Sequence, residues 1–422
     1  MTVPDRLPPD PADASDLSAG VGAEPSRRRS SAPTRGGGVV DRRGVIVLTA
    51  SHVVDDLYQG AVPALLPFLV LDRGYSYTAA TGIILAATVL SSVVQPAFGV
   101  LIDRRPLPWL TPVGLLVAGL GIGLSGIGES YWWTWSAVAL SGLGVAAYHP
   151  AAARAARAAA GASAQGMSWF AVGGNAGLAL GPVVVTPVLL AYGVSGTPLL
   201  ALPAMAMAVF LLAVHRRTQA RAARTAARRP AEVAGTDDWR SFGWLTGLVV
   251  TRSVLYFGLS SLLALYVIAR FDVEQAIGSA ALVTFLGVGA AGTLAGGWLA
   301  DRRGRLTAIR LGYALALPGL VVLLTAPAWP VAVAAAALLG VGVYLPFSVQ
   351  TTLGQEYLPN RIGTASGVTL GLAVSAGGAV TPVLGLLADA YGLAWALGAL
   401  LLLPPLALAL SSRLRPPADR AI

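Results

Sequence analysis

Long apolar runs recur along the whole chain of 422 residues and restrict its possible folds more than any other feature. Each run has about 18 residues or more, enough for a helix to cross the roughly 30 Å hydrocarbon core of a membrane. Charged residues are only 12% of the chain, against roughly 25% in soluble domains, and the mean hydropathy is +0.69. The runs predict twelve membrane spans, near residues 44–71, 77–101, 108–128, 132–153, 167–192, 197–214, 243–269, 275–300, 306–326, 329–355, 363–388 and 393–412.

The arginines indicate how these spans are oriented. The chain has 29 arginines and no lysine. Arg73 and Arg270 lie in loops after odd-numbered spans, and Arg252 lies deep inside a span, but all the others fall at the termini, in loops after even-numbered spans, or within a few residues of such a loop. Positive residues stay on the cytoplasmic side. We therefore expect a multi-pass protein of the cell inner (plasma) membrane with both termini in the cytoplasm, which requires an even number of spans.

Composition further divides the chain into five parts. Residues 1–42 are rich in Pro, Asp, Ser and Arg and contain no apolar run, so they predict a disordered cytosolic tail. We expect six-helix bundles at 43–214 and 243–412, a basic cytosolic linker at 215–242, and a cytosolic tail at 413–422. The linker arginines favour contact with anionic lipid headgroups over nucleic-acid binding. The predicted fold class is an all-α integral membrane protein with twelve transmembrane helices in two bundles.

One short pattern closes both the second and the eighth predicted span. It reads GVLIDRR at Gly99–Arg105 and GWLADRRGR at Gly297–Arg305. Glycine lets a helix end approach a neighbouring helix, the aspartate can face the positive amino terminus of another span, and the arginines hold the loop on the cytoplasmic side. We expect these loops to control gating, through Gly99, Asp103, Arg104, Gly297, Asp301, Arg302, Gly304 and Arg305.

The first span carries ionisable side chains at membrane depth. A carboxylate there is costly unless it lines a polar cavity, pairs with another group or takes up a proton. Asp55 and Asp56 point roughly 100° apart on a helix, and His52 lies one turn before either of them. We predict that Asp56 carries a proton with His52 as its partner, the alternative being a structural polar cluster. For Asp55 the structural role is the favoured one.

A second histidine, His149, stands before Pro150 in the fourth span. The proline frees a backbone carbonyl and bends the helix. A histidine at this position could titrate near neutral pH and take part in proton coupling. Alternatively, a neighbouring helix satisfies its hydrogen bonds.

We place the predicted substrate site on residues of the first, fifth and seventh spans. Arg252 is the one arginine deep in a span, where it either receives an anionic substrate or neutralises Asp55 or Asp56 across the bundle interface. Asn175 lies near mid-membrane in the fifth span, and Tyr58 and Gln59 complete the set.

Other residues near span ends or within the fifth span favour packing roles. The Gly177–Pro182 segment permits close helix packing, which by itself accounts for its glycines. We expect Glu356 and Asp389, at the ends of the tenth and eleventh spans, to be interface residues rather than ligands.

Several segments together resemble the major facilitator superfamily, over about residues 43 to 412. The second loop copy matches that family's Gly-x-Leu-Ala-Asp-Arg-x-Gly-Arg pattern at every defined position, although Leu306 replaces the usual basic residue after it. The first copy departs after Arg105 in a way that resembles the fosmidomycin-resistance branch. The same branch is indicated by SHVVDD at 51–56, YHP at 148–150, GGN at 173–175, QEYLP at 355–359 and RIG at 361–363.

The resemblance implies a secondary transporter that rocks two six-helix bundles around a site near the membrane midplane. It further implies proton-driven export of a small drug-like or anionic compound such as a phosphonate antibiotic, with Asp56 in the place of the acid in the branch's motif. The Gly177–Pro182 segment resembles the antiporter signature of drug exporters. Better-known members often carry an acid where this chain has Ala151, so a proton route through an acid at that position is not expected. The alternatives are a proton-coupled symporter that imports a nutrient or anion, and a non-transporting membrane sensor or scaffold.

The sequence predicts neither an enzyme nor a cofactor. Without lysine the chain cannot form the phosphate-binding loop of nucleotide-driven pumps. It has no cysteine for thiolate metal sites, and we expect no metal-ligand cluster and no hydrolytic triad. The expected partners are a small-molecule substrate, protons and membrane lipids, with no nucleic acid, and the expected state is a monomer.

Overall fold

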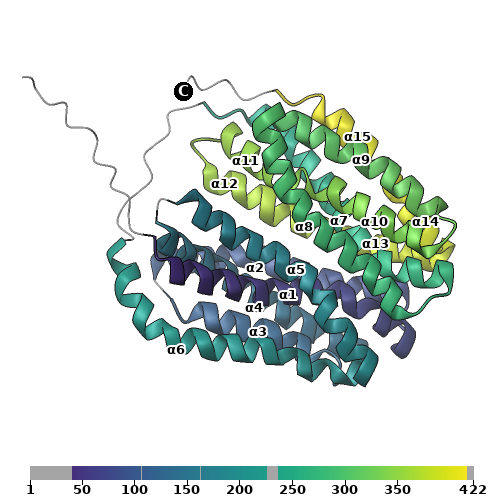
Figure 1. Ribbon diagram of the computed structural model, residues 1–422, viewed down its shortest axis with the longest axis horizontal. Helices are drawn as coiled ribbons and strands as arrows, with labels where there is room; N and C mark the ends of the chain where they lie inside the picture. The colour runs from purple at the N-terminus through teal and green to yellow at the C-terminus, as the bar shows by residue number, and fades with distance from the viewer. Residues whose placement is uncertain (1–39, 106, 162, 226–235, 416–422) are drawn as a thin grey trace, which may run out of the picture. The chain divides into compact units, whose positions relative to one another are not determined.

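Helices form the regular structure of the chain in the computed structural model, which describes residues 40–105, 107–161, 163–225 and 236–415 (Figure 1). A backbone inside a membrane must satisfy its own hydrogen bonds, and apolar runs of this length do so as helices. The described residues contain no strand and belong to one unit, Gly38–Ile422. Nearly all of the predicted disordered tail and the centre of the predicted linker lie outside the described residues.

The first half supplies six of the predicted spans. The helices are α1 (Arg42–Arg73), α2 (Tyr77–Arg104), α3 (Leu110–Leu124), α4 (Tyr131–Ala160), α5 (Ala164–Tyr192), and η1 (Val194–Ala201) continued by α6 (Leu202–Thr225). Serine caps begin several of them, since the hydroxyls of Ser76, Ser130 and Ser163 each accept the backbone N–H three residues further on.

The second half repeats the first with more interrupted helices. They are α7 (Trp239–Phe271), α8 (Gln275–Arg303), α9 (Arg305–Thr325), α10 (Trp329–Tyr344), α11 (Phe347–Tyr357), α12 (Ile362–Ser366), the π-helix η2 (Gly367–Leu372), α13 (Ala373–Tyr391), α14 (Leu393–Ala399), η3 (Leu400–Leu402) and α15 (Leu403–Ser411). Ten stretches of the described residues are long and apolar enough to cross a membrane. The shorter α3, together with α4, fills the two remaining positions, which confirms the predicted fold class.

Helix ends at the predicted linker differ from the expected bounds. The linker was expected over 215–242, whereas α6 continues to Thr225 and α7 already begins at Trp239. Asp238 caps α7, its carboxylate accepting the Ser241 N–H at 3.0 Å. Hydrogen bonds from the hydroxyl and the backbone of Ser241 lower the pKa of Asp238 below its usual value. This cap fixes the start of the seventh span four residues before the apolar run.

The two halves meet along α2 and α13, α5 and α8, and α1 and α7 (Figure 1). We call the end of the bundle where α1 passes into α2 the outer end, and the opposite end, where α2 finishes, the inner end. At the outer end the Asp389 carboxylate of α13 accepts the backbone N–H groups of Tyr77 and Thr78, at 2.8 and 2.9 Å, and the Thr78 hydroxyl at 2.6 Å. The Thr381 hydroxyl donates to the carbonyl of Thr81. Asp389 is thus an interface residue, as expected.

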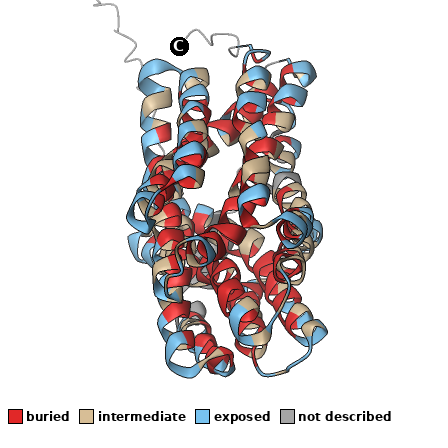
Figure 2. Cartoon of the chain, turned by 90° about the vertical axis from the view of Figure 1, so that its right-hand side faces the viewer, coloured by how far each residue is buried: buried red, intermediate tan, exposed pale blue. Residues whose placement is uncertain are grey.

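The inner ends of α2 and α8 have a different environment. Nothing lies within 4 Å of the position that a Cβ would take at Gly99 or Gly297, and the neighbouring Val100 and Trp298 are about half exposed. The close approach that we expected these glycines to allow is therefore absent from this conformation, because the contacts that join α2 to the second half lie nearer its outer end. In Figure 2, buried residues are concentrated around the middle of the bundle.

Candidate functional site

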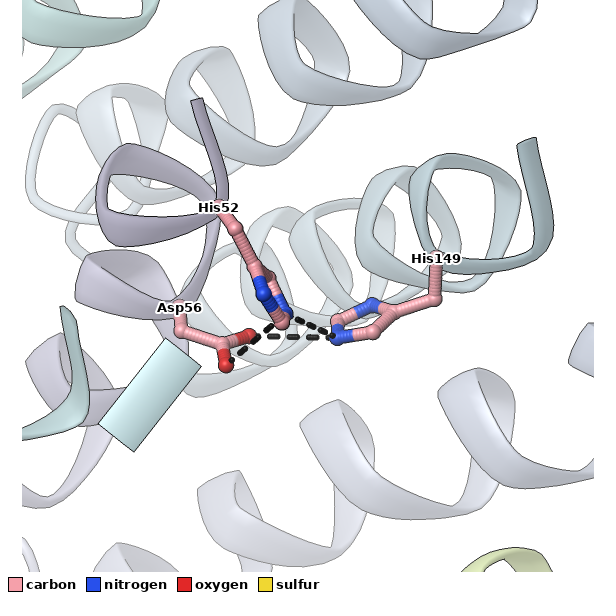
Figure 3. Close-up of side chains that lie close together, drawn as sticks. All are labelled: His52, Asp56 and His149. Carbon is pink, nitrogen blue, oxygen red and sulfur yellow. Dashed lines mark hydrogen bonds and ion pairs between the residues drawn. The ribbon is translucent and has the colours of Figure 1, made fainter. Parts of the chain in front are cut away.

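A buried cluster of ionisable side chains joins α1 to α4. His52 and Asp56 lie one turn apart on α1, with Nε2 of His52 3.3 Å from Oδ2 of Asp56. His149 reaches across from α4, its Nε2 atom 3.3 Å from Oδ1 of Asp56 and 3.4 Å from Nε2 of His52. Figure 3 shows the three side chains converging. The structure thus brings together Asp56 and His52, which the sequence favoured for proton coupling, and His149, whose part in coupling the sequence left open.

Backbone carbonyls orient both imidazole rings. Nδ1 of His52 lies 2.8 Å from the carbonyl oxygen of Phe170, on whose ring His52 also stacks with centroids 4.1 Å apart. Nδ1 of His149 lies 3.0 Å from the carbonyl oxygen of Val145. A carbonyl only accepts hydrogen bonds, so we assign a proton to each Nδ1 atom. Both Nε2 atoms are then left to present lone pairs to Asp56 unless a further proton is added.

Asp55 lies beside this cluster but has no hydrogen bond to either of its carboxylate oxygens among the described residues. The residue is fully buried, and Oδ2 is 3.4 Å from Nδ1 of His149. A buried carboxylate without a hydrogen bond is costly unless it is neutral or balanced by a nearby positive charge. The Asp55 side chain therefore lacks the hydrogen bonds to a neighbouring helix that its predicted structural role requires. His149 is the group that can balance its charge.

Glycines of α5 make room for the cluster. A Cβ at Gly174 would lie 2.8 Å from Cε1 and 3.0 Å from Nε2 of His52, and closer still to Oδ2 of Asp56. A Cβ at Gly177 would overlap the carbonyl oxygen of Val53 on α1. The glycines therefore let α5 pack directly on α1, as the packing interpretation of this segment predicted, and no larger residue fits there without displacement.

Arg252 occupies a separate buried site in the second half. Its Nε atom donates to Oε1 of Gln350 at 3.1 Å, and its guanidinium lies 4.7 Å from the centre of the Phe347 ring. Gln350 in turn donates to the hydroxyl of Tyr313 at 2.9 Å. No ion pair joins Arg252 to a carboxylate within the described ranges, so the predicted neutralisation of Asp55 or Asp56 is absent from this conformation.

The other predicted substrate-site residues have different surroundings. Gln59 donates to Oδ1 of Asp56 and so belongs to the cluster. Asn175 follows Gly174 on α5 and is partly exposed. Tyr58 is fully buried, where its hydroxyl donates to the carbonyl of Leu200 and accepts the N–H of Ala204, both at 2.9 Å. The expected substrate contact of Tyr58 does not fit this structure, because the residue is two positions beyond Asp56 and points toward α6.

The predicted gating residues lie at the inner end. Arg104, Asp301, Arg302 and Gly304 are exposed, and the side chain of Asp103 is outside the described part of the structure. Gly304 has a φ of 87° and stands immediately before α9, where the left-handed backbone favours glycine. Arg305 forms an ion pair with Glu356, which is therefore an interface residue, as expected.

Sequence reasoning missed two groups of residues and one chemical possibility. It did not find the Phe170 and Val145 carbonyls, which carry no side-chain signal, or Gln350, whose position as a polar residue inside an apolar span was a usable signal. It also expected no metal-ligand cluster. The structure corrects this, because one donor atom from each of His52, Asp56 and His149 lies within 4.8 Å of the others. The three residues come from two helices, so their sequence spacing gives no ligand motif.

Comparison with known proteins places the chain in a family. The sequence pattern of the Major Facilitator Superfamily matches residues 48–382. Over 374 residues the chain is 30% identical to the uncharacterized MFS-type transporter YfnC of Bacillus subtilis (strain 168), covering 86% of this chain and 90% of that protein. It is 28% identical over 347 residues to the fosmidomycin resistance protein of Escherichia coli (strain K12), covering 81% of this chain and 85% of that protein.

Solved structures agree at the level of the fold. A bacterial homolog of the human lysosomal transporter Spinster, in an inward-facing and occupied conformation, matches with a TM-score of 0.74 at 14% identity, covering 90% of this chain and 98% of that one. The nucleoside transporter NupG matches with a TM-score of 0.70 at 10% identity, covering 87% and 98%. These findings confirm the resemblance drawn from the loop patterns. The chain is a multi-pass membrane transporter that belongs to the Major Facilitator Superfamily.

Proposed function

We propose that this transporter exports a small drug-like or anionic compound in exchange for protons, by alternating access between two six-helix bundles at 43–214 and 243–412. The observation that carries the proposal is the cluster of His52, Asp56 and His149 in the first bundle, with Asp55 beside it. Ionisable groups at membrane depth are costly, and a group that binds and releases a proton is one of the few uses that offset the cost. The proposed orientation has both termini in the cytoplasm, so that the inner end faces the cytoplasm.

The geometry of the cluster supports uptake of one proton. With both Nδ1 atoms donating to carbonyls, the two Nε2 atoms and the Asp56 carboxylate are acceptors that face one another at 3.3 to 3.4 Å. A proton on Nε2 of His149 converts one repulsive pair into a charge-assisted hydrogen bond to Asp56. When the proton leaves, Asp56 still accepts the hydrogen bond from Gln59. We therefore assign Asp56 as the proton carrier, His52 as its partner and His149 as the group that shares the proton.

A route for the proton follows from exposure. The side chains of His52 and Asp56 are each 9% exposed, whereas that of His149 is 23% exposed. His149 is thus the member of the cluster through which a proton from water reaches Asp56. Asp55 lies 3.4 Å from the other ring nitrogen of His149, where an ionised carboxylate balances the charge of a protonated imidazole.

The surroundings of Arg252 favour a substrate that carries an anionic group. The residue is buried, and among the described residues its side chain contacts a neutral amide and an aromatic ring rather than a carboxylate. A buried guanidinium without a negative partner attracts an anion strongly in a low-dielectric site. The similarity to a fosmidomycin resistance protein makes a phosphonate antibiotic the first compound to test. We assign Arg252 and Asn175 to the proposed substrate site, with Gln59 linking it to the proton cluster.

Transport by Asp56→Asn tests the proposal. The amide keeps the shape and much of the hydrogen bonding of Asp56 but cannot carry the proton. In inverted membrane vesicles we expect it to abolish uphill uptake of a phosphonate antibiotic or of a transported member of a cationic drug panel, while counterflow exchange at equal pH survives better. Asp272→Asn is the matched control, because Asp272 is exposed after α7 with a φ of 50°, a backbone conformation that asparagine accepts.

Each other outcome has a distinct meaning. Full proton-driven transport by Asp56→Asn would remove the carrier role of Asp56. Substrate entry into intact cells that rises with an inward proton gradient would favour the symporter. A ligand that binds to the purified protein but never crosses the membrane would favour the sensor or scaffold.

A further inference from the structure

The donor atoms of the cluster are spaced like the ligands of a metal ion. Nε2 of His52 lies 3.3 Å from Oδ2 of Asp56, Nε2 of His149 lies 3.3 Å from Oδ1 of Asp56, and the two Nε2 atoms are 3.4 Å apart. Ligands at about 2.0 to 2.1 Å from a tetrahedral zinc ion lie roughly 3.3 to 3.4 Å from one another. The two Nε2 atoms therefore have the spacing of two zinc ligands, and each of them lies at that spacing from one oxygen of the Asp56 carboxylate (Figure 3). One donor atom from each of the three residues lies within 4.8 Å of the others, so small side-chain rotations bring all three onto one ion.

Both imidazoles are held as metal-binding histidines are held. A metal-bound histidine usually donates its second ring N–H to a carbonyl or carboxylate, which fixes the tautomer and points the lone pair at the metal. Here the carbonyls of Phe170 and Val145 take that part at 2.8 and 3.0 Å. Asp55 adds a carboxylate oxygen 3.4 Å from Nδ1 of His149. The groups around the donor atoms thus already hold both imidazole rings in place.

Charge and space also suit a divalent ion. The carboxylates of Asp55 and Asp56 balance two positive charges in a place where an unbalanced charge is costly. Because Gly174 has no Cβ, the side chains of His52 and Asp56 can lie directly against α5 at this point. The partial exposure of His149 leaves one side of the site accessible, and three protein ligands leave a fourth position for water.

We propose that His52, Asp56 and His149 bind one divalent transition-metal ion of the zinc, cobalt or nickel type. Two imidazole donors with one carboxylate favour such ions over magnesium or calcium, which prefer oxygen ligands. This inference goes beyond the proposed proton exchange and does not depend on it, because it concerns equilibrium binding to the purified protein.

Metal titration of the purified full-length chain tests the site. The protein carries a tag without histidine and is first treated with a chelator, and Zn²⁺ or Co²⁺ is then titrated by calorimetry and visible absorption. The background is low, because the chain has no cysteine and only three histidines. We expect one ion per chain in the wild type. His149→Gln should weaken binding on the order of 100-fold or more, since the loss of a supporting residue alone costs about 10- to 100-fold.

His215→Gln is the matched control, since it changes the remaining histidine, which lies on α6 and not on α1 or α4. We expect it to bind the metal as the wild type does. Thermal unfolding without metal shows whether each variant is folded.

A second variant gives a positive signal that misfolding cannot mimic. Asp56→Cys puts the chain's one thiol at the proposed site, and bound Co²⁺ should then show a thiolate-to-cobalt charge-transfer band that the wild type lacks. Absence of a bound ion in the wild type, equal binding by His149→Gln, equal loss by His215→Gln, or no such band would each overturn the metal site. None of these results would decide whether Asp56 carries a proton, which the transport assay measures separately.

Discussion

A methyl group added at Gly174 should disturb the cluster directly. The Cβ of Gly174→Ala would lie 2.8 and 3.0 Å from two atoms of the His52 ring and closer still to Oδ2 of Asp56. Separations below about 3 Å force a shift, and adding a methyl to a well-packed core costs about 1 to 3 kcal/mol. That cost corresponds to a factor of roughly 5 to 150 in an equilibrium. Because the clash falls on two members of the cluster, we expect proton-driven transport to fall by a factor in this range.

The assay compares Gly174→Ala with Gly398→Ala, where nothing lies within 4 Å of the added Cβ. Proton-driven uptake into inverted vesicles and thermal unfolding are measured for both variants. We expect Gly398→Ala to behave as the wild type in both. Wild-type transport by Gly174→Ala would refute the reasoning, whether or not its thermal stability falls, because the position of His52 and Asp56 would then not matter for coupling.

Two further changes test the outer end and the second-half site. Asp389→Ala removes a cap on the first turn of α2, worth about 0.5 to 2 kcal/mol, and should shift the bundle toward opening at the outer end. A thiol introduced by Thr81→Cys should then be labelled faster in the Asp389→Ala background than in Thr81→Cys alone. An unchanged labelling rate would show that the cap does not hold the outer end closed. Arg252→Gln should weaken transport of a phosphonate by on the order of 2 to 5 kcal/mol and spare a neutral substrate. Equal losses for both substrates, with folding recovered when Asp55→Asn or Asp56→Asn is added, would show instead that Arg252 neutralises an acid.

The part of the site that lies within one helix could be predicted from the sequence. His52 and Asp56 are four residues apart, so helical geometry alone places them on one face. The same geometry should have warned against Tyr58, which is two positions further along and faces α6. The sequence alone therefore predicts which residues within one helical turn share a face, before the packing of the helices is known.

Contacts between helices could not be predicted in this way. His149 meets Asp56 because α4 packs beside α1, and the Phe170 carbonyl meets His52 because glycines let α5 come close. These distances depend on the rotation of each helix about its axis, which the apolar runs do not specify. The same limit applies to Arg252, whose contact with Gln350 depends on the break between α10 and α11.

The cap that Asp389 forms at the outer end suggests what the repeated aspartates at the inner end do. The segment GLLADAYG at Gly385–Gly392 repeats the Gly-x-Leu-x-Asp spacing of Gly99–Asp103 and Gly297–Asp301. In this third copy the aspartate, Asp389, accepts backbone N–H groups at the amino terminus of α2, a helix of the other half. A carboxylate at such a terminus satisfies free N–H groups and interacts with the positive end of the helix dipole. The outer end therefore displays the interaction that we expected of Asp103 and Asp301. Alternating access closes one end as the other opens. A cap at the outer end would then stabilise the conformation closed at that end, and caps by Asp103 and Asp301 would stabilise the conformation closed at the inner end.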